Sequence, residues 1–548
     1  LSSILADPLI ARVRLEAAQT ENIDWLDLKL IFDIEGADLK PADIRRLVAA
    51  KGGFVRLADG TWRRVQLELT EEQKVMIDKL GIDLDEFSDE AHRVHLRHLA
   101  GQEAAEFINP KAWQHIAARL ADAELESRPP VPAGLHATLR PYQIDGFHFL
   151  TYLTINSIGG ILADDMGLGK TLQSIAWILW LREKAGTRLF SDSTEPPRVP
   201  PVLVVCPKSV LDVWAAEMNK CATHLNVQVL HDKDQLDLDL LRTRIDVLVL
   251  NYAQLRGSID SLHTLHWLAV ILDEGQQIKN PESKAAKAAR QIRAENRLVL
   301  TGTPLENRLL DLWSLMTFAT PGALGDRAYF HRHFDRRKDE RATQRLSARL
   351  RPFMIRRTKS QVAKELPART EESMLCEMAG VQALLYKEEL ARAQHMVLST
   401  SGFDSLNKQR FAILQALTRL RQICCHPALV QPTATTEESA KLTATLELIE
   451  ELHAEGHKVL LFSQFVSMLK IIRERLEAMK LPYHWLTGAS SNRAEIVRNF
   501  QEDPLASVFL ISLKAGGSGL NLTAASYVIL YDPWWNPAVE AQAIDRAH

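Results

Sequence analysis

Short apolar runs alternate with helical patterns along most of this chain. Between about 135 and 320 the runs fall at 159–163, 202–206, 247–250, 268–272 and 297–300. After residue 431, three more follow at 458–462, 507–512 and 527–531. Continuous apolar runs separated by helices are typical of strands that are buried on both faces of a parallel sheet. We therefore predict two α/β lobes, each built on a parallel sheet.

The rest of the chain follows other patterns. Residues 54–69 predict a β-hairpin with an Asp-Gly turn, and helical patterns lie at 71–80, 91–99 and 112–121. Residues 321–428 are mostly helical in pattern and basic in places. We therefore predict an α+β N-terminal accessory domain at 1–130, a first lobe at 131–320, helical insertions at 321–430 and a second lobe at 431–548.

Composition narrows the class of protein. The chain has 548 residues, of which 46% are hydrophobic and 25% charged, as in ordinary globular proteins. Its formal net charge of −3 excludes a uniformly basic nucleic-acid binder, although local charge still allows a basic groove. The five cysteines contain no C-x-x-C pair, which argues against a disulfide framework or a zinc ribbon. Reduced thiols in the cytoplasm are the simpler interpretation of these cysteines, so we expect a cytoplasmic protein. No apolar run reaches about 18 residues, so we expect no membrane span.

The run ADDMGLGKT at 163–171 lies between the first apolar run of the first lobe and a helical pattern at 172–181. Strand, glycine-rich loop, Lys-Thr and helix are the order that binds the phosphates of a nucleotide. The glycines let backbone N–H groups close on the anion, Lys170 adds a charge, and Thr171 offers a hydroxyl to Mg²⁺. The usual pattern has a first glycine where this chain has Asp164, so the assignment depends on motifs further along the chain.

An acidic pair, Asp273 and Glu274, follows the apolar run 268–272. It stands 103 residues after Lys170 (273 − 170), which fits the acidic motif of an ATPase. Asp273 is expected to hold Mg²⁺ through water, and Glu274 to orient or deprotonate the attacking water. An isolated Asp-Glu pair is more often a solvated loop, but its place after a phosphate loop favours the catalytic interpretation.

Other polar segments extend this candidate site. Residues 301–307 form a polar loop after the run 297–300 that can sense the γ-phosphate. The amide of Gln143 can donate to and accept from an adenine edge. Near the end of the chain, Arg546 can act as an arginine finger on the γ-phosphate. The alternative for Arg546 is a surface ion pair with Asp545 or Glu540.

Taken together, these segments resemble the Swi/Snf-type ATPases of helicase superfamily two. The resemblance covers roughly residues 135–548, and residues 1–130 are similar, more weakly, to an accessory domain of some bacterial members. The motifs stand in family order: LRPYQ (139–143), DDMGLGKT (164–171), PKSVLDVW (207–214), DEGQQIKN (273–280), LTGTPLEN (300–307), FMIRRTK (353–359), ICCHPAL (423–429), LFSQF (461–465), TGASSNR (487–493), KAGGSGLNL (514–522), DPWWNP (532–537) and QAIDRAH (542–548).

The resemblance implies two RecA-like lobes with helical insertions and an ATP-dependent translocase on double-stranded DNA. Such a motor remodels or displaces protein–DNA complexes without routine strand separation. The catalytic residues implied are Lys170, Asp273, Glu274 and Arg546, with Mg²⁺ at Thr171 and Asp273. ATP is expected at Gln143, Asp165, Met166, Gly167, Leu168, Gly169, Lys170, Thr171, Gly519 and Gln542. Backbone contacts to DNA are expected at Lys208, Ser209, Asn251, Thr487, Lys514 and Trp535; for Trp535 the alternative is packing in the lobe core.

Asp164 departs from the general phosphate-loop pattern but agrees with the family, whose phosphate loop carries Asp at this position. Other positions do depart from the family pattern. Gln276 stands where many relatives have His, and Gln can still donate and accept. We expect a fragment of a longer protein, because the chain opens at Leu1 without Met and stops at His548, before the Arg-Ile-Gly-Gln of the family pattern.

Partners and competing functions follow from the same resemblance. We expect a monomer that binds duplex DNA and acts on a DNA-bound protein or RNA polymerase, associated with the nucleoid if the source is bacterial. One alternative is an RNA-directed or polymerase-recycling ATPase of the same fold. Another is a scaffold that binds ATP without hydrolysing it, against which the intact Lys170, Asp273, Glu274 and Arg546 argue.

Overall fold

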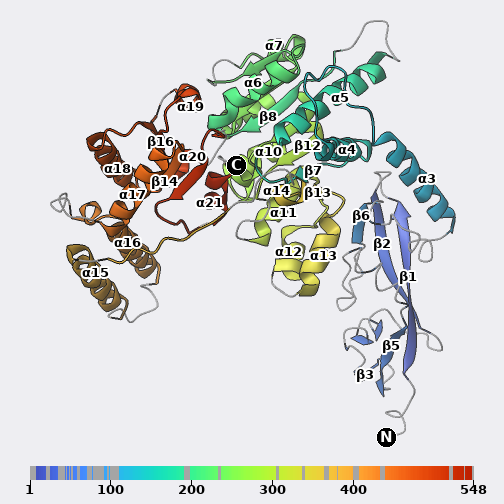
Figure 1. The fold of residues 1–548 in the computed structure, drawn as a ribbon. Coiled ribbons are helices and arrows are strands. Elements are labelled where there is room, and N and C mark those ends of the chain that lie inside the picture. The colour runs from blue at the N-terminus through green and yellow to red at the C-terminus, as the bar shows by residue number, and fades with distance from the viewer. Residues whose placement is uncertain are drawn as a thin grey trace. The chain divides into compact units, whose positions relative to one another are not determined.

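The structure is a computed structural model of the chain. It describes residues 8–19, 25–34, 43–44, 46–47, 50, 53–57, 62–68, 70, 77, 80, 92–95, 98, 110–190, 198–231, 236–303, 308–335, 340–362, 370–378, 380–398, 406–431, 439–490, 492–516, 522–535 and 537–545. The chain divides into two compact units, Leu1–Ala363 and Lys364–His548, and each is described by itself (Figure 1).

The N-terminal part of the first unit contains a four-stranded sheet of order β5-β1-β2-β6 (blue in Figure 1). Strand β1 pairs antiparallel with β2 and parallel with β5, and β2 pairs antiparallel with β6. A short antiparallel pair, β3 with β4, matches the predicted hairpin, although the turn residues 58–61 lie outside the described residues. The elements are β1 (Leu9–Gln19), β2 (Trp25–Ile34), β3 (Val55–Arg56), β4 (Trp62–Arg63), β5 (Val65–Glu68), β6 (His92–His95) and α3 (Pro110–Glu126).

Two features of this region differ from the sequence analysis. The helical pattern at 91–99 was misleading, because residues 92–95 form strand β6. Pairing with β2 along an open edge decides the conformation of this short segment, and Val94 is buried there at 2% exposure. The long strands β1 and β2 were not predicted at all. Helix α3 confirms the pattern at 112–121, whereas most of 71–80 lies outside the described residues.

The first predicted α/β lobe contains a seven-stranded sheet of order β13-β7-β12-β11-β8-β10-β9, in which every neighbouring pair is parallel. Its central strands are buried on both faces, which explains their continuous apolar sequences. The five predicted strands are all present, and β9 and β13 join them at the two edges. The strands are β7 (Gly160–Leu162), β8 (Val202–Cys206), β9 (Val227–Val229), β10 (Val247–Asn251), β11 (His266–Leu272), β12 (Arg293–Leu300) and β13 (Met354–Ile355).

Helices connect these parallel strands and cover the sheet. The chain first runs from β7 outward to β8 and β9, then returns through β10, β11 and β12 and passes β7 to reach β13. Right-handed crossovers in opposite directions place helices on opposite faces, so this order describes a doubly wound sheet. The helices are α4 (Pro141–Ile155), α5 (Lys170–Phe190), α6 (Leu211–Cys221), α7 (Leu238–Thr243), α8 (Tyr252–Gly257), α9 (Ile259–Leu262), α10 (Lys284–Gln291) and α11 (Leu309–Ala319), with short η3 (Lys208–Val210) and η5 (Gly275–Ile278).

A helical insertion separates β12 from β13 (yellow in Figure 1). Phe330, Phe334 and Phe353 are almost completely buried within this region and join the core of the sheet. After the insertion the chain returns to the sheet as β13, and α14 follows close to the end of the first unit. The elements are α12 (Arg327–Phe330), a π-helical turn η6 (His331–Asp335), α13 (Glu340–Leu350) and α14 (Lys359–Val362).

The second unit contains a four-stranded parallel sheet of order β15-β16-β14-β17. This sheet confirms the second α/β lobe, with β15 as a strand that the apolar pattern did not reveal. The elements are α15 (Gly380–Leu398), α16 (Leu406–Cys425), η8 (Pro427–Leu429), α17 (Ala440–Ala454), β14 (Val459–Ser463), α18 (Val466–Ala478), β15 (Tyr483–Leu486), α19 (Arg493–Glu502), β16 (Val508–Ser512), α20 (Leu513–Gly516), β17 (Tyr527–Leu530) and α21 (Pro537–Ile544). None of the helices in the described ranges has the length and apolar character that a membrane span needs.

Candidate active site

The loop between β7 and α5 has the geometry of an anion cradle. Gly167 and Gly169 have φ values of 84° and 74°, a region that glycine adopts at little cost. A Cβ on Gly169 would also lie 2.3 Å from the amide nitrogen of Gln143. Helix α5 begins at Lys170, directly after this loop. Because the first N–H groups of a helix lack partners within it, the loop presents backbone donors and a positive dipole end to an anion.

Lys170 is held beneath this loop by backbone carbonyls. Its Nζ donates to the carbonyl oxygens of Asp164 at 2.7 Å and Asp165 at 3.1 Å. Burial lowers the pKa of this ammonium group, and the charges of Glu274 and Asp273 act in the opposite direction. The same charges show that the structure brings the loop lysine and the acidic pair close together. A phosphate would further stabilise the ammonium ion in this partly desolvated position.

Asp273 follows β11 and is fixed at both carboxylate oxygens. Its Oδ2 accepts a hydrogen bond from Trp214 Nε1 at 2.8 Å, and its Oδ1 accepts one from the backbone N–H of Glu274 at 2.9 Å. The hydroxyl of Tyr252 donates to its backbone carbonyl at 2.7 Å. Burial raises the pKa of Asp273 to about 6; the Glu274 charge adds to this effect, and the Trp214 hydrogen bond opposes it.

Two of the residues expected to hold a cation, Asp273 and Thr171, carry oxygen atoms that suit a magnesium ion. The Asp273 carboxylate and the Thr171 hydroxyl are hard donors of the kind that Mg²⁺ prefers. No group of three or more His, Cys, Asp or Glu residues in the described ranges could hold a metal by itself. A magnesium ion held by these two residues would take its other ligands from water and from a nucleotide's phosphates, as is usual for Mg²⁺.

Glu274 is connected by side-chain hydrogen bonds to the loop after β12. Its Oε2 accepts from Gln276 Nε2 at 2.7 Å, and Gln276 Oε1 accepts from Thr301 Oγ1 at 3.1 Å. Glu274 has a φ of 51°, a left-handed conformation that costs a non-glycine residue on the order of 1 kcal/mol. Gln276 thus uses both ends of its amide to connect Glu274 with Thr301. The described part of the following polar loop, 301–303, thus lies beside the acidic pair, while 304–307 lie outside the described residues.

Gln143 contacts the phosphate loop directly. Its Nε2 donates to the carbonyl oxygen of Leu168 at 3.2 Å, and its Oε1 accepts from the backbone N–H of Arg140 at 2.9 Å. The side chain is buried, with 7% exposure. In this structure, therefore, the amide joins the start of α4 to the loop, next to Gly169.

The residues expected to contact DNA in the first unit lie at or just after the carboxyl ends of strands in the large sheet. Lys208 is exposed, and both it and Ser209 belong to the short helix η3 that follows β8. Asn251 is the last residue of β10 and caps α8, with its Oδ1 accepting from the backbone N–H groups of Ala253 and Gln254. All three positions lie at the edge of the sheet that also carries the phosphate loop and the acidic pair.

The second unit places its candidates differently. Thr487 follows β15 and is almost completely buried at 5% exposure. Trp535 is 61% exposed, which excludes packing in the lobe core, and the guanidinium of Arg421 lies 4.9 Å from the centre of its ring. Gly519 and Arg546 lie outside the described residues, as do the side chains of Lys514 and Gln542.

Sequence reasoning missed two residues that orient Asp273. Trp214 and Tyr252 contact this aspartate from α6 and α8, which follow the neighbouring strands β8 and β10. Trp214 is the last residue of the motif PKSVLDVW at 207–214, and its place after a predicted strand was the available signal. That signal alone does not reveal which carboxylate the indole N–H contacts.

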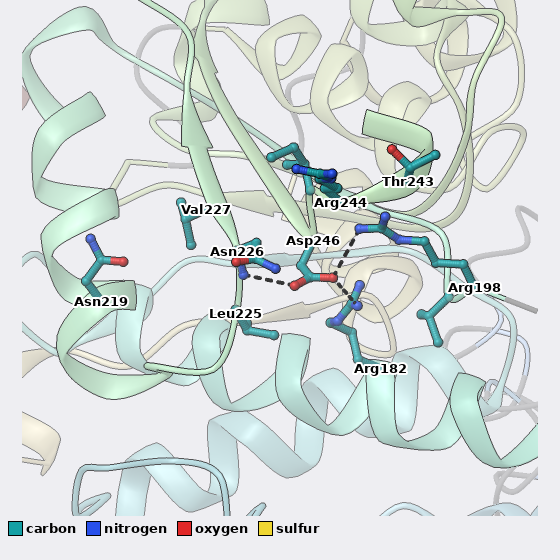
Figure 2. A pocket seen from close by; sticks show the side chains of 11 residues that line it. Arg182, Arg198, Asn219, Leu225, Asn226, Val227, Thr243, Arg244 and Asp246 are labelled. Atoms are coloured by element: carbon teal, nitrogen blue, oxygen red, sulfur yellow. Dashed lines mark hydrogen bonds and ion pairs between the residues drawn. The ribbon is translucent and has the colours of Figure 1, made fainter. Parts of the chain in front are cut away.

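A separate cavity of about 740 Å³ opens at the other end of the same strands (Figure 2). There Asp246 accepts a hydrogen bond from Arg182 Nη2 at 2.5 Å, and Arg198 Nη2 lies 3.6 Å from the same carboxylate oxygen. Because Arg198 precedes β8 and Asp246 precedes β10, the cavity lies at the amino-terminal edge of the sheet. Its ion pairs join α5 to the start of β10, and it takes no part in the site at the opposite edge.

Two protein-family models match the chain over its two α/β regions. The family model described as SNF2-related domain matches residues 142–429. A second model, described as helicase conserved C-terminal domain, matches residues 440–548. The two matches cover both parallel sheets.

Individual relatives are longer than this chain. The chain is similar to the putative ATP-dependent helicase/translocase YwqA of Bacillus subtilis, with 33% identity over 95% of this chain and 58% of YwqA. It is also similar to the ISWI chromatin-remodeling complex ATPase ISW1 of Saccharomyces cerevisiae, with 34% identity over 76% of this chain and 38% of ISW1. A solved Sulfolobus solfataricus SWI2/SNF2 ATPase core in complex with dsDNA aligns with 76% of this chain and 86% of its own, at 36% identity and a TM-score of 0.41.

The raised pKa of Asp273 predicts how cation binding depends on pH. The carboxyl group must be ionised to bind Mg²⁺, and its pKa is about 6 in the nucleotide-free protein. We expect affinity for Mg²⁺ with a non-hydrolysable ATP analogue to fall as the pH is lowered through 6, measured by calorimetry. Asp273→Asn is the control, because it should bind weakly at every pH. If Asp273→Asn keeps the same pH dependence, the titrating group belongs to the nucleotide and the assignment of Asp273 is wrong.

Proposed function

The chain belongs to the SNF2-related family, and from this premise we propose that it is an ATP-driven translocase on double-stranded DNA. It uses the free energy of ATP hydrolysis to move along the duplex and to remodel or displace protein–DNA complexes, without separating the strands. The chain spans 58% of YwqA and 38% of ISW1, so this activity is proposed for the longer protein that contains it.

One observation carries the ATPase part of the proposal. The ammonium of Lys170 lies below a glycine loop at a helix N-terminus and interacts electrostatically with both Asp273 and Glu274. A phosphate chain in the loop would therefore lie near both a cation and a carboxylate that can bind a metal ion. This pairing of charges is suited to phosphoryl transfer and has little purpose in a scaffold that only holds a nucleotide.

Each residue of the site has a separate role in this proposal. The loop N–H groups and Lys170 bind and orient the phosphates. A magnesium ion held by Asp273 and Thr171 would supply positive charge that offsets the charge of the phosphates. Glu274 orients the attacking water or accepts its proton, and Gln276 holds the Glu274 carboxylate in place. Because Thr301 donates a hydrogen bond to Gln276, the loop after β12 can respond to whether ATP or its products occupy the site.

The DNA part of the proposal is supported by surface residues and by the relatives. Lys208 is exposed after β8, and Trp535 is exposed beside Arg421 in the second unit. Cationic and aromatic side chains suit contacts to a sugar-phosphate backbone, which do not depend on base sequence. YwqA is named a helicase/translocase and ISW1 a chromatin-remodeling ATPase. A motor that moves over any sequence needs this kind of contact.

We expect Lys170→Ala and Glu274→Gln to abolish ATP hydrolysis in the full-length protein. The first variant should lose nucleotide binding, because it removes the ammonium group that pairs with the phosphate charge. The second should still bind ATP and lose turnover by roughly two orders of magnitude or more, because the group that orients water is gone. Steady-state phosphate release and analogue binding measure the two effects. The exposed Lys284→Ala is the control and should match the wild type; hydrolysis that survives either site variant would contradict the assignment.

We expect Gln276→Leu to lower kcat by about tenfold while leaving the KM for ATP nearly unchanged. Leucine removes the donor that holds Glu274 Oε2 and the acceptor for Thr301, but it does not touch the phosphate loop. Gln277→Leu is a matched control, because Gln277 is the exposed neighbour on the same short helix. Equal kinetics of the two leucine variants would show that the Gln276 bridge has no catalytic role.

We expect duplex DNA to stimulate hydrolysis more than RNA does, and ATP to drive displacement of the third strand from a DNA triplex. Lys208→Ala should weaken stimulation and reduce the salt dependence of DNA binding by about one unit of log–log slope, because one phosphate contact is lost. Lys284→Ala serves again as the control. Equal or greater stimulation by RNA would favour an RNA-directed ATPase instead, and stimulation without triplex displacement would exclude translocation.

A further inference from the structure

Asp164, the residue that replaces the usual first glycine of the phosphate loop, is completely buried and paired with Arg357. The Asp164 Oδ1 accepts from Arg357 Nε at 2.9 Å, and Oδ2 accepts from Arg357 Nη2 at 2.5 Å. The side chains are 0% and 11% exposed. A guanidinium and a carboxylate joined through two parallel bonds have a fixed relative orientation. The two residues are 193 positions apart in the chain.

The same guanidinium contacts two further elements of the site. Its Nη2 donates to Gln173 Oε1 in α5 at 2.9 Å, and its Nη1 donates to the carbonyl oxygen of Tyr142 in α4. Gly146 in α4 leaves the space for this arrangement, since a Cβ there would lie 1.7 Å from Gln173 Oε1 and 2.6 Å from Arg357 Nη2. One side chain therefore joins α4, which carries Gln143, to the phosphate loop and to the helix that begins with Lys170.

Backbone hydrogen bonds hold the two segments together along their length. Strand β13 pairs in parallel with β7, and the ladder continues past both strands, because the N–H of Asp165 donates to the carbonyl oxygen of Arg357 at 2.9 Å. The N–H of Lys359 in turn donates to Asp165 Oδ2 at 3.1 Å. Lys170 rests on the carbonyl oxygens of Asp164 and Asp165, the two loop residues that this second segment fixes.

We propose that Arg357 is a positioning residue of the nucleotide site, which sets the phosphate loop through Asp164 and ties it to the last segment of the first unit. This inference rests on the proposed ATPase function and assigns it a residue outside the loop and the acidic pair. The hydrogen bonds described for the Arg357 side chain go to Asp164, Gln173 and Tyr142, and none goes to Lys170 or to the acidic pair. It acts through the position of Lys170 and of Gln143. The consequence is that a substitution far along the chain changes affinity for ATP.

The test compares three variants of the full-length protein: Arg357→Met, the double variant Asp164→Asn with Arg357→Met, and the exposed neighbour Arg356→Met as control. Arg357→Met leaves a buried carboxylate without its partner and should lower the melting temperature. The double variant removes the buried charge and should recover much of that loss. Both should show about a tenfold higher KM for ATP, with a smaller change in kcat, because a misplaced loop binds phosphate less well. Arg356→Met should match the wild type.

The separation of stability from affinity decides the inference. A double variant that recovers the wild-type KM together with its melting temperature would show that the pair only balances charge, and would overturn the positioning role. The positioning role would also be overturned if Arg357→Met, assayed at a temperature below its melting temperature, had the wild-type KM for ATP. Binding of an ATP analogue, measured in parallel, keeps the two proposals distinct. If the wild type binds the analogue without hydrolysing ATP, the proposed function fails, while weaker binding by both Arg357 variants still supports the inference.

Discussion

The parallel arrangement of strands in the large sheet is the constraint on which the candidate site depends. In a parallel sheet every strand ends at the same edge, so loops that are far apart in sequence meet there. The backbone shows this directly, because the N–H of Thr301 donates to the carbonyl oxygen of Leu162 and that of Asp273 to Val205. The phosphate loop, the acidic pair and the polar loop after β12 are therefore neighbours before any side chain is considered.

A balance of charge then determines what this edge can bind. Burial removes solvation from Lys170, and the charges of Glu274, Asp273, Asp164 and Asp165 compensate only in part, so that its pKa is still lowered. Asp273 is in the converse state, since burial and the Glu274 charge raise its pKa despite the Trp214 hydrogen bond. Both groups gain when an anion reaches the lysine and a cation reaches the aspartate. Phosphate together with Mg²⁺ supplies these two charges at once.

The sequence predicted the buried strands of both lobes well, because a strand covered on both faces needs a continuous apolar run, as in Val202–Cys206. It predicted a helix for a segment that includes His92–His95, where pairing with β2 decides the conformation, and it overlooked the two long strands before it. The loop lysine and the acidic pair were recognisable from their residue types after predicted strands. The sequence did not reveal the roles of Trp214, Tyr252 and Arg357. Those roles depend on the order of the strands in the sheet, which local sequence patterns do not predict.

Asp164 shows why a departure from a motif can have a structural reason. Among the loop residues, only Gly167 and Gly169 have positive φ values, so the conformation at position 164 does not require glycine. The position can therefore carry a side chain. The Asp164 carboxylate pairs with Arg357 and so connects the loop to the segment that follows β13. Burying such a pair contributes little net stability by comparison with apolar packing, since desolvation offsets most of the attraction. The gain is in geometry, because two parallel hydrogen bonds fix the loop on which Lys170 rests.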